Sequence, residues 1–124
     1  MPKKILAAED SPTILEMIKQ SLEEGGFSVI TAIDGQDALE KARVQKPDLI
    51  VLDLMLPKVD GYKVCRMLKF DEKYKAIPII VLTARAGEAD KKLAAEVRAD
   101  AYLVKPFEPE VLLSKIKEFL GAGS

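Results

Sequence analysis

Five short, mostly aliphatic runs recur along the chain, and each is followed by a segment with helical spacing. The runs lie at residues 5–8, 27–32, 49–52, 79–82 and 101–104. Runs rich in Ile, Val and Leu without polar alternation are typical of strands buried on both faces of a parallel sheet. Their alternation with helical patterns predicts repeated βα units, and therefore an α/β fold with the sheet between helix layers.

Five helices are predicted between and after these strands. They are expected after Ser11-Pro12, after Asp34-Gly35, from about Tyr62 to Phe70, near Glu88 to Arg98, and from Pro109 onward. Ser11 is a good N-cap residue, and proline is favoured at the first helical position that follows it. The first helix is expected to stop at Gly25-Gly26.

Length and composition indicate one globular domain. The chain has 124 residues, of which 48% are hydrophobic and 31% charged, as is ordinary for a soluble protein. Disorder and a membrane span are therefore not expected. Residues 1–120 are predicted to form the domain, and residues 121–124 a flexible tail, a linker stub or a cloning remnant.

The charge balance and the rare residue types exclude several classes of function. Nineteen basic against twenty acidic side chains give a net charge of -1, so neither direct nucleic-acid binding nor membrane binding is expected. The single cysteine, Cys65, and the lack of an apolar segment after Met1 favour the cytoplasm. The absence of histidine excludes Ser-His triads and the usual zinc ligand sets.

Polar side chains follow four of the five buried runs. Glu9-Asp10, Asp53, Thr83 and Lys105 stand at or just beyond the ends of those runs. Ligands of parallel sheets collect beyond the carboxyl ends of the strands, so these groups are expected to converge. Three carboxylates brought together repel one another by several kcal/mol per pair at about 4 Å, and Mg²⁺ is the compensating cation that fits.

This mixture of groups also suits phosphoryl transfer. Asp53 is a candidate nucleophile that would form an aspartyl phosphate, and Lys105 would face the phosphoryl group as a point charge. Such a reaction needs positioning and charge neutralisation more than a proton-transfer residue.

Structural roles remain open for each residue taken singly. Glu9-Asp10 would also cap a helix beginning near Pro12, Thr83 would also serve as an ordinary strand-end hydroxyl, and Lys105 would also reach solvent. The coincidence of all of them at equivalent strand ends favours a site.

These motifs resemble the receiver domain of two-component response regulators, the CheY-like family. The resemblance covers nearly the whole chain, in Glu9-Asp10, in Asp53-Leu-Met-Leu-Pro57 with Gly61 beyond, in Thr83-Ala84 and in Tyr102-Leu-Val-Lys105-Pro106-Phe107. It implies a three-layer, doubly wound, flavodoxin-like fold. The five-stranded parallel sheet would have strand order 2-1-3-4-5 and be flanked by five helices.

The resemblance also implies a role for each site residue. Asp53 would be the phosphoacceptor, and Mg²⁺ would be held by Glu9, Asp10, Asp53 and the main-chain carbonyl of Met55. Thr83 and Lys105 would bind phosphoryl oxygens, while Thr83 and Tyr102 would move as the switch. The Lys105-Pro106 bond is expected to be cis by the same resemblance.

The implied function is a signalling switch rather than a metabolic enzyme, with catalysis limited to its own phosphorylation and dephosphorylation. A sensor histidine kinase or a phosphotransfer protein would donate the phosphoryl group. The face built from the fourth helix, the fifth strand and the last helix would then control a downstream output protein or domain, or pair with a second copy of the chain.

Three other functions share parts of this pattern. A receiver-like docking module would work without phosphorylation, and an FMN carrier would need a less acidic loop after the first strand. A phosphatase of the haloacid dehalogenase type expects a second acid two residues after the nucleophile, where this chain has Met55.

One departure from the receiver-domain family is Arg98, which stands where glycine is common, so a left-handed turn there is expected to be strained or remodelled. Met55 and Arg85 occupy positions that flank the phosphate in the family that this chain resembles.

Overall fold

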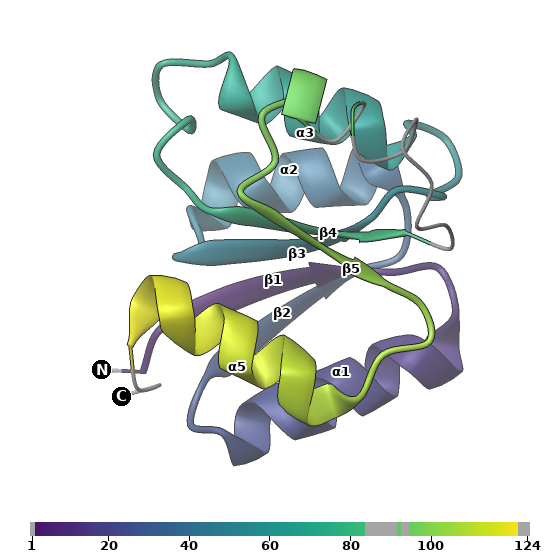
Figure 1. The fold of residues 1–124 in the computed structure, drawn as a ribbon. Coiled ribbons are helices and arrows are strands. Elements are labelled where there is room, and N and C mark those ends of the chain that lie inside the picture. Colours follow the sequence, from purple (N-terminus) through teal and green to yellow (C-terminus); the bar gives the residue numbers. More distant parts are fainter. Residues whose placement is uncertain (1, 84–91, 93–94, 122–124) are drawn as a thin grey trace.

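The computed structural model describes residues 2–83, residue 92 and residues 95–121 (Figure 1). The strands are β1 (Lys4–Ala8), β2 (Ser28–Ala32), β3 (Leu49–Asp53), β4 (Ile79–Thr83) and β5 (Ala101–Val104). The helices are α1 (Pro12–Glu24), α2 (Gly35–Gln45), α3 (Gly61–Lys69) and α5 (Pro109–Leu120). The helix predicted near Glu88 to Arg98 lies largely outside the described residues, and so does Arg85.

All five strands are parallel and form one sheet in the order β2-β1-β3-β4-β5. The doubly wound fold and the strand order 2-1-3-4-5 are therefore confirmed. The register pairs Ala8 with Leu52, Asp53 with Leu82, and Thr83 with Val104. Because the strands run in one direction, the segments that follow these residues emerge at the same edge of the sheet.

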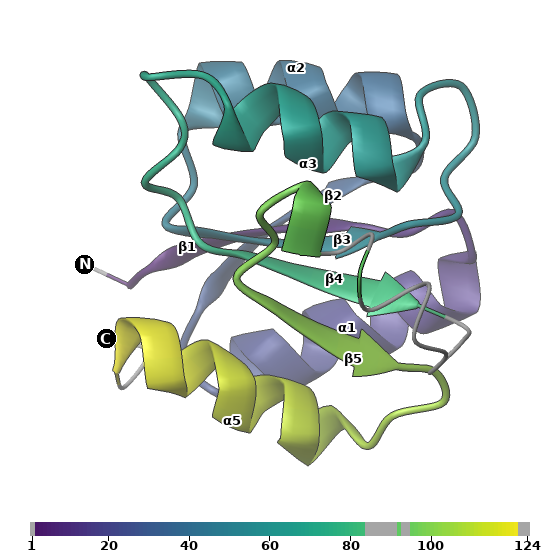
Figure 2. The ribbon, with the colours of Figure 1, turned by 45° about the horizontal axis from the view of Figure 1, so that its top comes forward.

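Helices cover both faces of the sheet, α2 and α3 on one side and α1 and α5 on the other (Figures 1 and 2). In β3, Ile50 and Leu52 belong to the core cluster beneath α2 and α3, whereas Leu49 and Val51 belong to the cluster beneath α1 and α5. Successive strand residues point to opposite faces, so a strand covered on both sides must be apolar at every position. This explains the unbroken aliphatic runs of the sequence.

Local sequence signals define where the helices begin. The Ser11 hydroxyl accepts a hydrogen bond from the Ile14 amide, and the Asp60 carboxylate accepts one from the Lys63 amide. Each supplies an acceptor for an amide that has no partner inside the helix. The predicted N-cap at Ser11 is confirmed.

Two backbone features expected from the family resemblance are present. The Lys105-Pro106 peptide bond is cis. Arg98 has φ of 63°, so the left-handed turn is retained with a non-glycine residue. The guanidinium of Arg98 lies 4.2 Å from the centroid of the Phe70 ring.

The start of β1 and the end of α5 lie near each other, at the opposite edge of the sheet from the carboxyl ends of the strands (Figures 1 and 2). Among the described helices, none is long and apolar enough to cross a membrane.

Cys65 is buried in the cluster beneath α2 and α3, and burial raises its thiol pKa to about 12. It is therefore a core residue and not a reactive thiol.

Candidate functional site

Glu9, Asp53 and Lys105 meet at the carboxyl edge of the sheet. The Lys105 ammonium donates hydrogen bonds to Glu9 Oε1 at 2.6 Å and to Asp53 Oδ2 at 2.9 Å. Glu9 is 1% exposed and Asp53 2%, so both acids are almost removed from solvent. The predicted convergence of these three residues is confirmed.

The alternation of side chains along the strands explains why these three residues meet. Ala7, Val51 and Leu103 all belong to the core cluster beneath α1 and α5. Each of the three charged residues stands two positions later on the same strand or just beyond it, and positions two apart point to the same face. The charged site therefore lies on the face of the sheet that α1 and α5 cover, at the carboxyl ends of the strands.

Asp10 completes an acidic group beside this ion pair. Oxygen atoms of Glu9, Asp10 and Asp53 all lie within 4.8 Å of one another. Asp10 itself is exposed. Lys105 supplies one positive charge for this group, which leaves an excess of negative charge that a divalent cation would offset. Oxygen ligands from carboxylates, with one side open to water, fit the preference of Mg²⁺.

The close packing of the charges changes their proton affinities. Burial and the hydrogen bond to Asp53 raise the pKa of Glu9 to about 7. Burial also tends to raise the pKa of Asp53, but its hydrogen bonds with Glu9, the Met55 amide and Lys105 outweigh burial and lower that pKa. Burial opposes the charge of Lys105, yet its two carboxylate partners raise its pKa. The charged form of Asp53 is thus favoured over its protonated form, and a charged carboxylate has the lone pairs that a nucleophile needs.

The residues that follow β3 hold the other oxygen of Asp53. The Met55 amide donates a hydrogen bond to Asp53 Oδ1 at 3.0 Å. The two oxygens of Asp53 therefore have different partners, a backbone amide and an ammonium group. The Met55 side chain is 72% exposed, and the role of its carbonyl as a metal ligand stays a prediction.

Thr83 and Tyr102 lie on the two strands beside the site. Thr83 is buried at the end of β4, and its carbonyl accepts a hydrogen bond from the Lys105 amide at 2.7 Å. This bond brings the Thr83 backbone next to Lys105. Tyr102 is half-buried and packs against the core cluster beneath α2 and α3. The movement predicted for Thr83 and Tyr102 stays a prediction.

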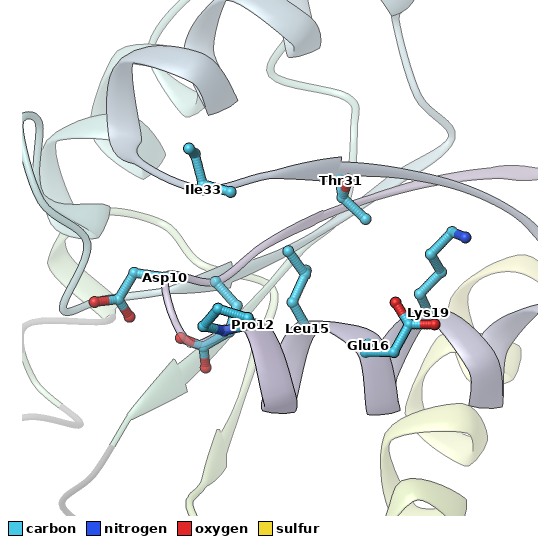
Figure 3. A pocket seen from close by; sticks show the side chains of 8 residues that line it. Asp10, Pro12, Leu15, Glu16, Lys19, Thr31 and Ile33 are labelled. Atoms are coloured by element: carbon cyan, nitrogen blue, oxygen red, sulfur yellow. The ribbon is translucent and has the colours of Figure 1, made fainter.

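A hollow of about 300 Å³ opens beside the acidic group, between α1 and the end of β2 (Figure 3). It is lined by Glu9, Asp10, Pro12, Leu15, Glu16, Lys19, Thr31 and Ile33. Figure 3 shows Asp10 at one end of the hollow and Lys19 at the other. Glu16 and Lys19 were not predicted as site residues, although their spacing of four and seven positions from Pro12 places them on the same helix face.

Comparisons with known proteins agree on one family. Residues 5–117 match the model of the response regulator receiver domain. The chain is 47% identical over 120 residues to the alkaline phosphatase synthesis transcriptional regulatory protein PhoP of Bacillus subtilis, covering 97% of this chain and 49% of PhoP. It is 41% identical over 114 residues to protein PilG of Pseudomonas aeruginosa, covering 92% of this chain and 84% of PilG. The chain spans about half the length of several curated relatives, PhoP among them.

Solved structures show the same relationship. The chemotaxis response regulator CheY4 of Vibrio cholerae matches with a TM-score of 0.90 and 34% identity, covering 96% of this chain and 99% of that one. The receiver domain of a sensor histidine kinase from Pseudomonas aeruginosa matches with a TM-score of 0.89 and 32% identity, covering 98% of this chain and 99% of that one. That structure is described with a magnesium ion coordinated in the active site cleft.

Proposed function

The chain belongs to the response regulator receiver domain family, and we propose that it is a phosphorylation-controlled switch in which Asp53 accepts the phosphoryl group. One observation carries this proposal. Asp53 is a buried carboxylate at the end of β3, 2.9 Å from the Lys105 ammonium and grouped with the carboxylates of Glu9 and Asp10. A buried acid in such a group is costly to maintain unless charge is bound there.

Mg²⁺ is the proposed cofactor, and when bound it would neutralise charge on the phosphoryl oxygens. Glu9, Asp10, Asp53 and the main-chain carbonyl of Met55 would hold it. The three carboxylates supply the oxygen donors that this ion prefers.

Attack by Asp53 on phosphorus would form the new oxygen–phosphorus bond, and the bond to the donor atom would break. The Met55 amide holds Oδ1 of Asp53, which leaves Oδ2, on the Lys105 side, to attack. Lys105 would then bind a phosphoryl oxygen as a point charge, and Thr83 would bind another through its hydroxyl.

The donor and the output are separate proposals. Receiver domains interact with histidine kinases and output domains. These 124 residues contain no histidine, so a histidine phosphodonor would lie outside them, and we propose a sensor histidine kinase or a phosphotransfer protein in the cytoplasm. The output would be a further domain or protein, or a second copy of the chain.

The proposed output face includes β5 and α5. Val111 and Phe119 of α5 are exposed apolar residues, which a partner would cover, and Thr83 and Tyr102 would couple this face to the phosphorylated site.

Residues 1–120 are proposed as the receiver unit and residues 121–124 as a tail. Relatives are named as transcriptional regulators about twice as long. The absence of direct nucleic-acid contact by these residues stays a prediction.

Labelling with acetyl phosphate tests the proposal. With Mg²⁺, the wild-type protein is expected to gain one phosphate that hydroxylamine removes, whereas Asp53→Asn gains none. Asp48→Asn is the matched control, because Asp48 precedes β3 at the other edge of the sheet and accepts a hydrogen bond from the Lys4 amide. Labelling that persists in Asp53→Asn would place the acceptor elsewhere. A wild-type protein that never takes the label would favour a docking module that works without phosphorylation.

A further inference from the structure

The loop of residues 54–60, which carries Met55, is in backbone contact with the first residues of α2. The Gly35 amide donates a hydrogen bond to the Pro57 carbonyl at 3.1 Å. A Cβ atom on Gly35 would overlap the carbonyl oxygen and carbon of Val59. Since the obstructing atoms are backbone, a side chain at position 35 would push the loop away from α2.

Asp34 reinforces this contact from the residue before the helix. Its Oδ1 caps α2 by accepting a hydrogen bond from the Asp37 amide at 2.7 Å, while its Oδ2 lies 3.4 Å from the Lys58 ammonium. The bond to the Asp37 amide lowers the pKa of Asp34. One buried carboxylate thus joins the start of α2 to the loop.

The loop needs such support because its backbone is not relaxed. Lys58 has φ of 69°, a left-handed conformation that costs about 1 kcal/mol for a residue with a side chain. The start of the loop is held by β4 and α3, through the Leu54 amide bonded to the Leu82 carbonyl and the Gly61 amide bonded to the Leu54 carbonyl. Its middle, residues 57–59, is held by α2 through the contacts of Asp34 and Gly35.

We propose that Asp34 and Gly35 position the loop that carries the Met55 carbonyl, and so set the affinity of the site for a divalent cation without touching that cation. The inference rests on the proposed function, in which this carbonyl is a metal ligand beside Asp53. The Met55 amide also holds Asp53, so a displaced loop would disturb two ligands together. Residues that orient metal ligands typically change affinity by about 10- to 100-fold when they are replaced.

The test compares two glycine substitutions. Gly35→Ala forces the loop away from α2. Gly25→Ala is the matched control: its Cβ would lie 2.7 Å from Leu113 Cδ1, the mobile end of a side chain, and Gly25 ends α1 away from the site. Titration calorimetry measures the Kd for Mg²⁺ of each variant, and urea unfolding without metal measures its stability.

We expect Gly35→Ala to raise the Kd for Mg²⁺ about tenfold, while Gly25→Ala leaves it unchanged. The amide signal of Met55 should also shift in metal-free Gly35→Ala, and not in Gly25→Ala. A folded Gly35→Ala protein with the wild-type Kd would overturn the inference, because glycine would then serve packing alone.

A second pair of variants decides the matter if Gly35→Ala does not fold. Asp34→Ala removes both the cap and the Lys58 pair, whereas Asp34→Asn keeps a good cap. We expect weaker Mg²⁺ binding in Asp34→Ala and most of the affinity restored in Asp34→Asn; wild-type affinity in Asp34→Ala would contradict the positioning role. A wild-type protein that binds no Mg²⁺ would instead refute the proposed function, and the inference with it.

Discussion

The ammonium nitrogen of Lys105 lies 2.9 Å from Oδ2 of Asp53, across 52 positions of sequence. The proposed nucleophile is therefore held by an internal positive charge. Lys105 directly follows β5. Its backbone is fixed by a hydrogen bond from the Lys105 amide to the Thr83 carbonyl. In the proposed function, entry of a phosphoryl group would exchange this ion pair for contacts of Lys105 with phosphoryl oxygens.

Lys105→Ala is expected to lower the metal-free stability by about 3 kcal/mol, because it leaves two buried acids without their cation. Mg²⁺ binding should be retained, since the lysine is not a metal ligand, while the structural response to phosphorylation should be blunted. Urea unfolding with and without Mg²⁺ measures the first two effects, and amide spectra with acetyl phosphate the third. Loss of Mg²⁺ binding would contradict the role given to Lys105.

Mg²⁺ should stabilise the wild-type protein against heat. The cation relieves repulsion among Glu9, Asp10 and Asp53, and a ligand at a hundred times its Kd adds about 2.7 kcal/mol. Thermal melting at millimolar Mg²⁺ measures the shift, with Asp10→Asn as the variant expected to lose most of it. An unchanged wild-type melting curve would count against the metal site.

The raised pKa of Glu9 predicts opposite pH trends for stability and metal binding. Its ordinary value is 4.5 and its value in the fold is about 7, so between these the folded protein binds a proton that the unfolded chain lacks. Metal-free stability from this group therefore falls as pH rises through that window. Mg²⁺ must displace the proton, so its affinity should rise over the same window and level off above it.

Titration calorimetry with Mg²⁺ and urea unfolding without metal, both between about pH 5 and about pH 8, check these trends. The pKa of Asp53 is lowered in the fold, not raised. Its contribution to stability therefore has the opposite pH dependence and is lost only in more acidic solution. A Kd for Mg²⁺ that does not vary with pH would show that Glu9 is already ionised.

The ion pair between the buried Lys69 and the partly exposed Asp100 is expected to matter for stability and not for phosphorylation. The Lys69 ammonium contacts Asp100 Oδ2 at 2.8 Å and the Ile77 carbonyl at 3.0 Å, and the Ile79 amide donates to the same Asp100 oxygen. These bonds join the end of α3 to the starts of β4 and β5, away from the site. Lys69→Ala removes charge-assisted hydrogen bonds, so it should cost about 1.5 to 3 kcal/mol in urea unfolding and leave labelling of Asp53 unchanged.

The exposed pair of Glu72 and Lys75 is the control for that substitution. Its side chains are 87% and 52% exposed, and such surface pairs contribute about 0 to 1 kcal/mol. Glu72→Ala should therefore leave the unfolding midpoint close to that of the wild type. An equal loss in both variants would mean that burial does not distinguish the two pairs.

Arg98 and Phe70 should be energetically coupled. Glycine at position 98 would remove about 1 kcal/mol of backbone strain from the left-handed conformation. It would also remove the exposed cation–π contact of Arg98 with the Phe70 ring, which contributes about 0.5 to 1 kcal/mol. Arg98→Gly should therefore be nearly neutral in the wild type and stabilising in a Phe70→Ala background. A double-mutant cycle by urea unfolding measures the difference, and additive effects would exclude the coupling.

The fold and the centre of the site could be predicted because few interactions determine them. Unbroken aliphatic runs such as 49–52 require cover on both faces of a sheet. Parallel strands then bring the residues after them to one edge, and this places Glu9, Asp53 and Lys105 together. The strand order itself came from the family resemblance, since periodicity does not rank strands in space.

The features that could not be predicted depend on contacts between distant segments. Arg98 keeps a left-handed turn while it stacks on Phe70, 28 positions earlier in the chain. Gly35 was predicted only as the start of a helix, whereas its backbone contact with Val59 depends on how α2 meets the loop after β3. Of the two outcomes expected at Arg98, strain or remodelling, the structure keeps the left-handed backbone, and nothing in the sequence indicated Phe70 as its partner.

The placement of Lys4 at the start of β1 and Leu120 at the end of α5, opposite the acidic edge (Figure 1), has a practical consequence. A fluorophore or an immobilising tether attached at either position would stand clear of the entrance used by a phosphodonor. Ligation at those ends should therefore permit single-molecule or surface-based kinetics of the proposed phosphorylation of Asp53 without obstructing the reaction.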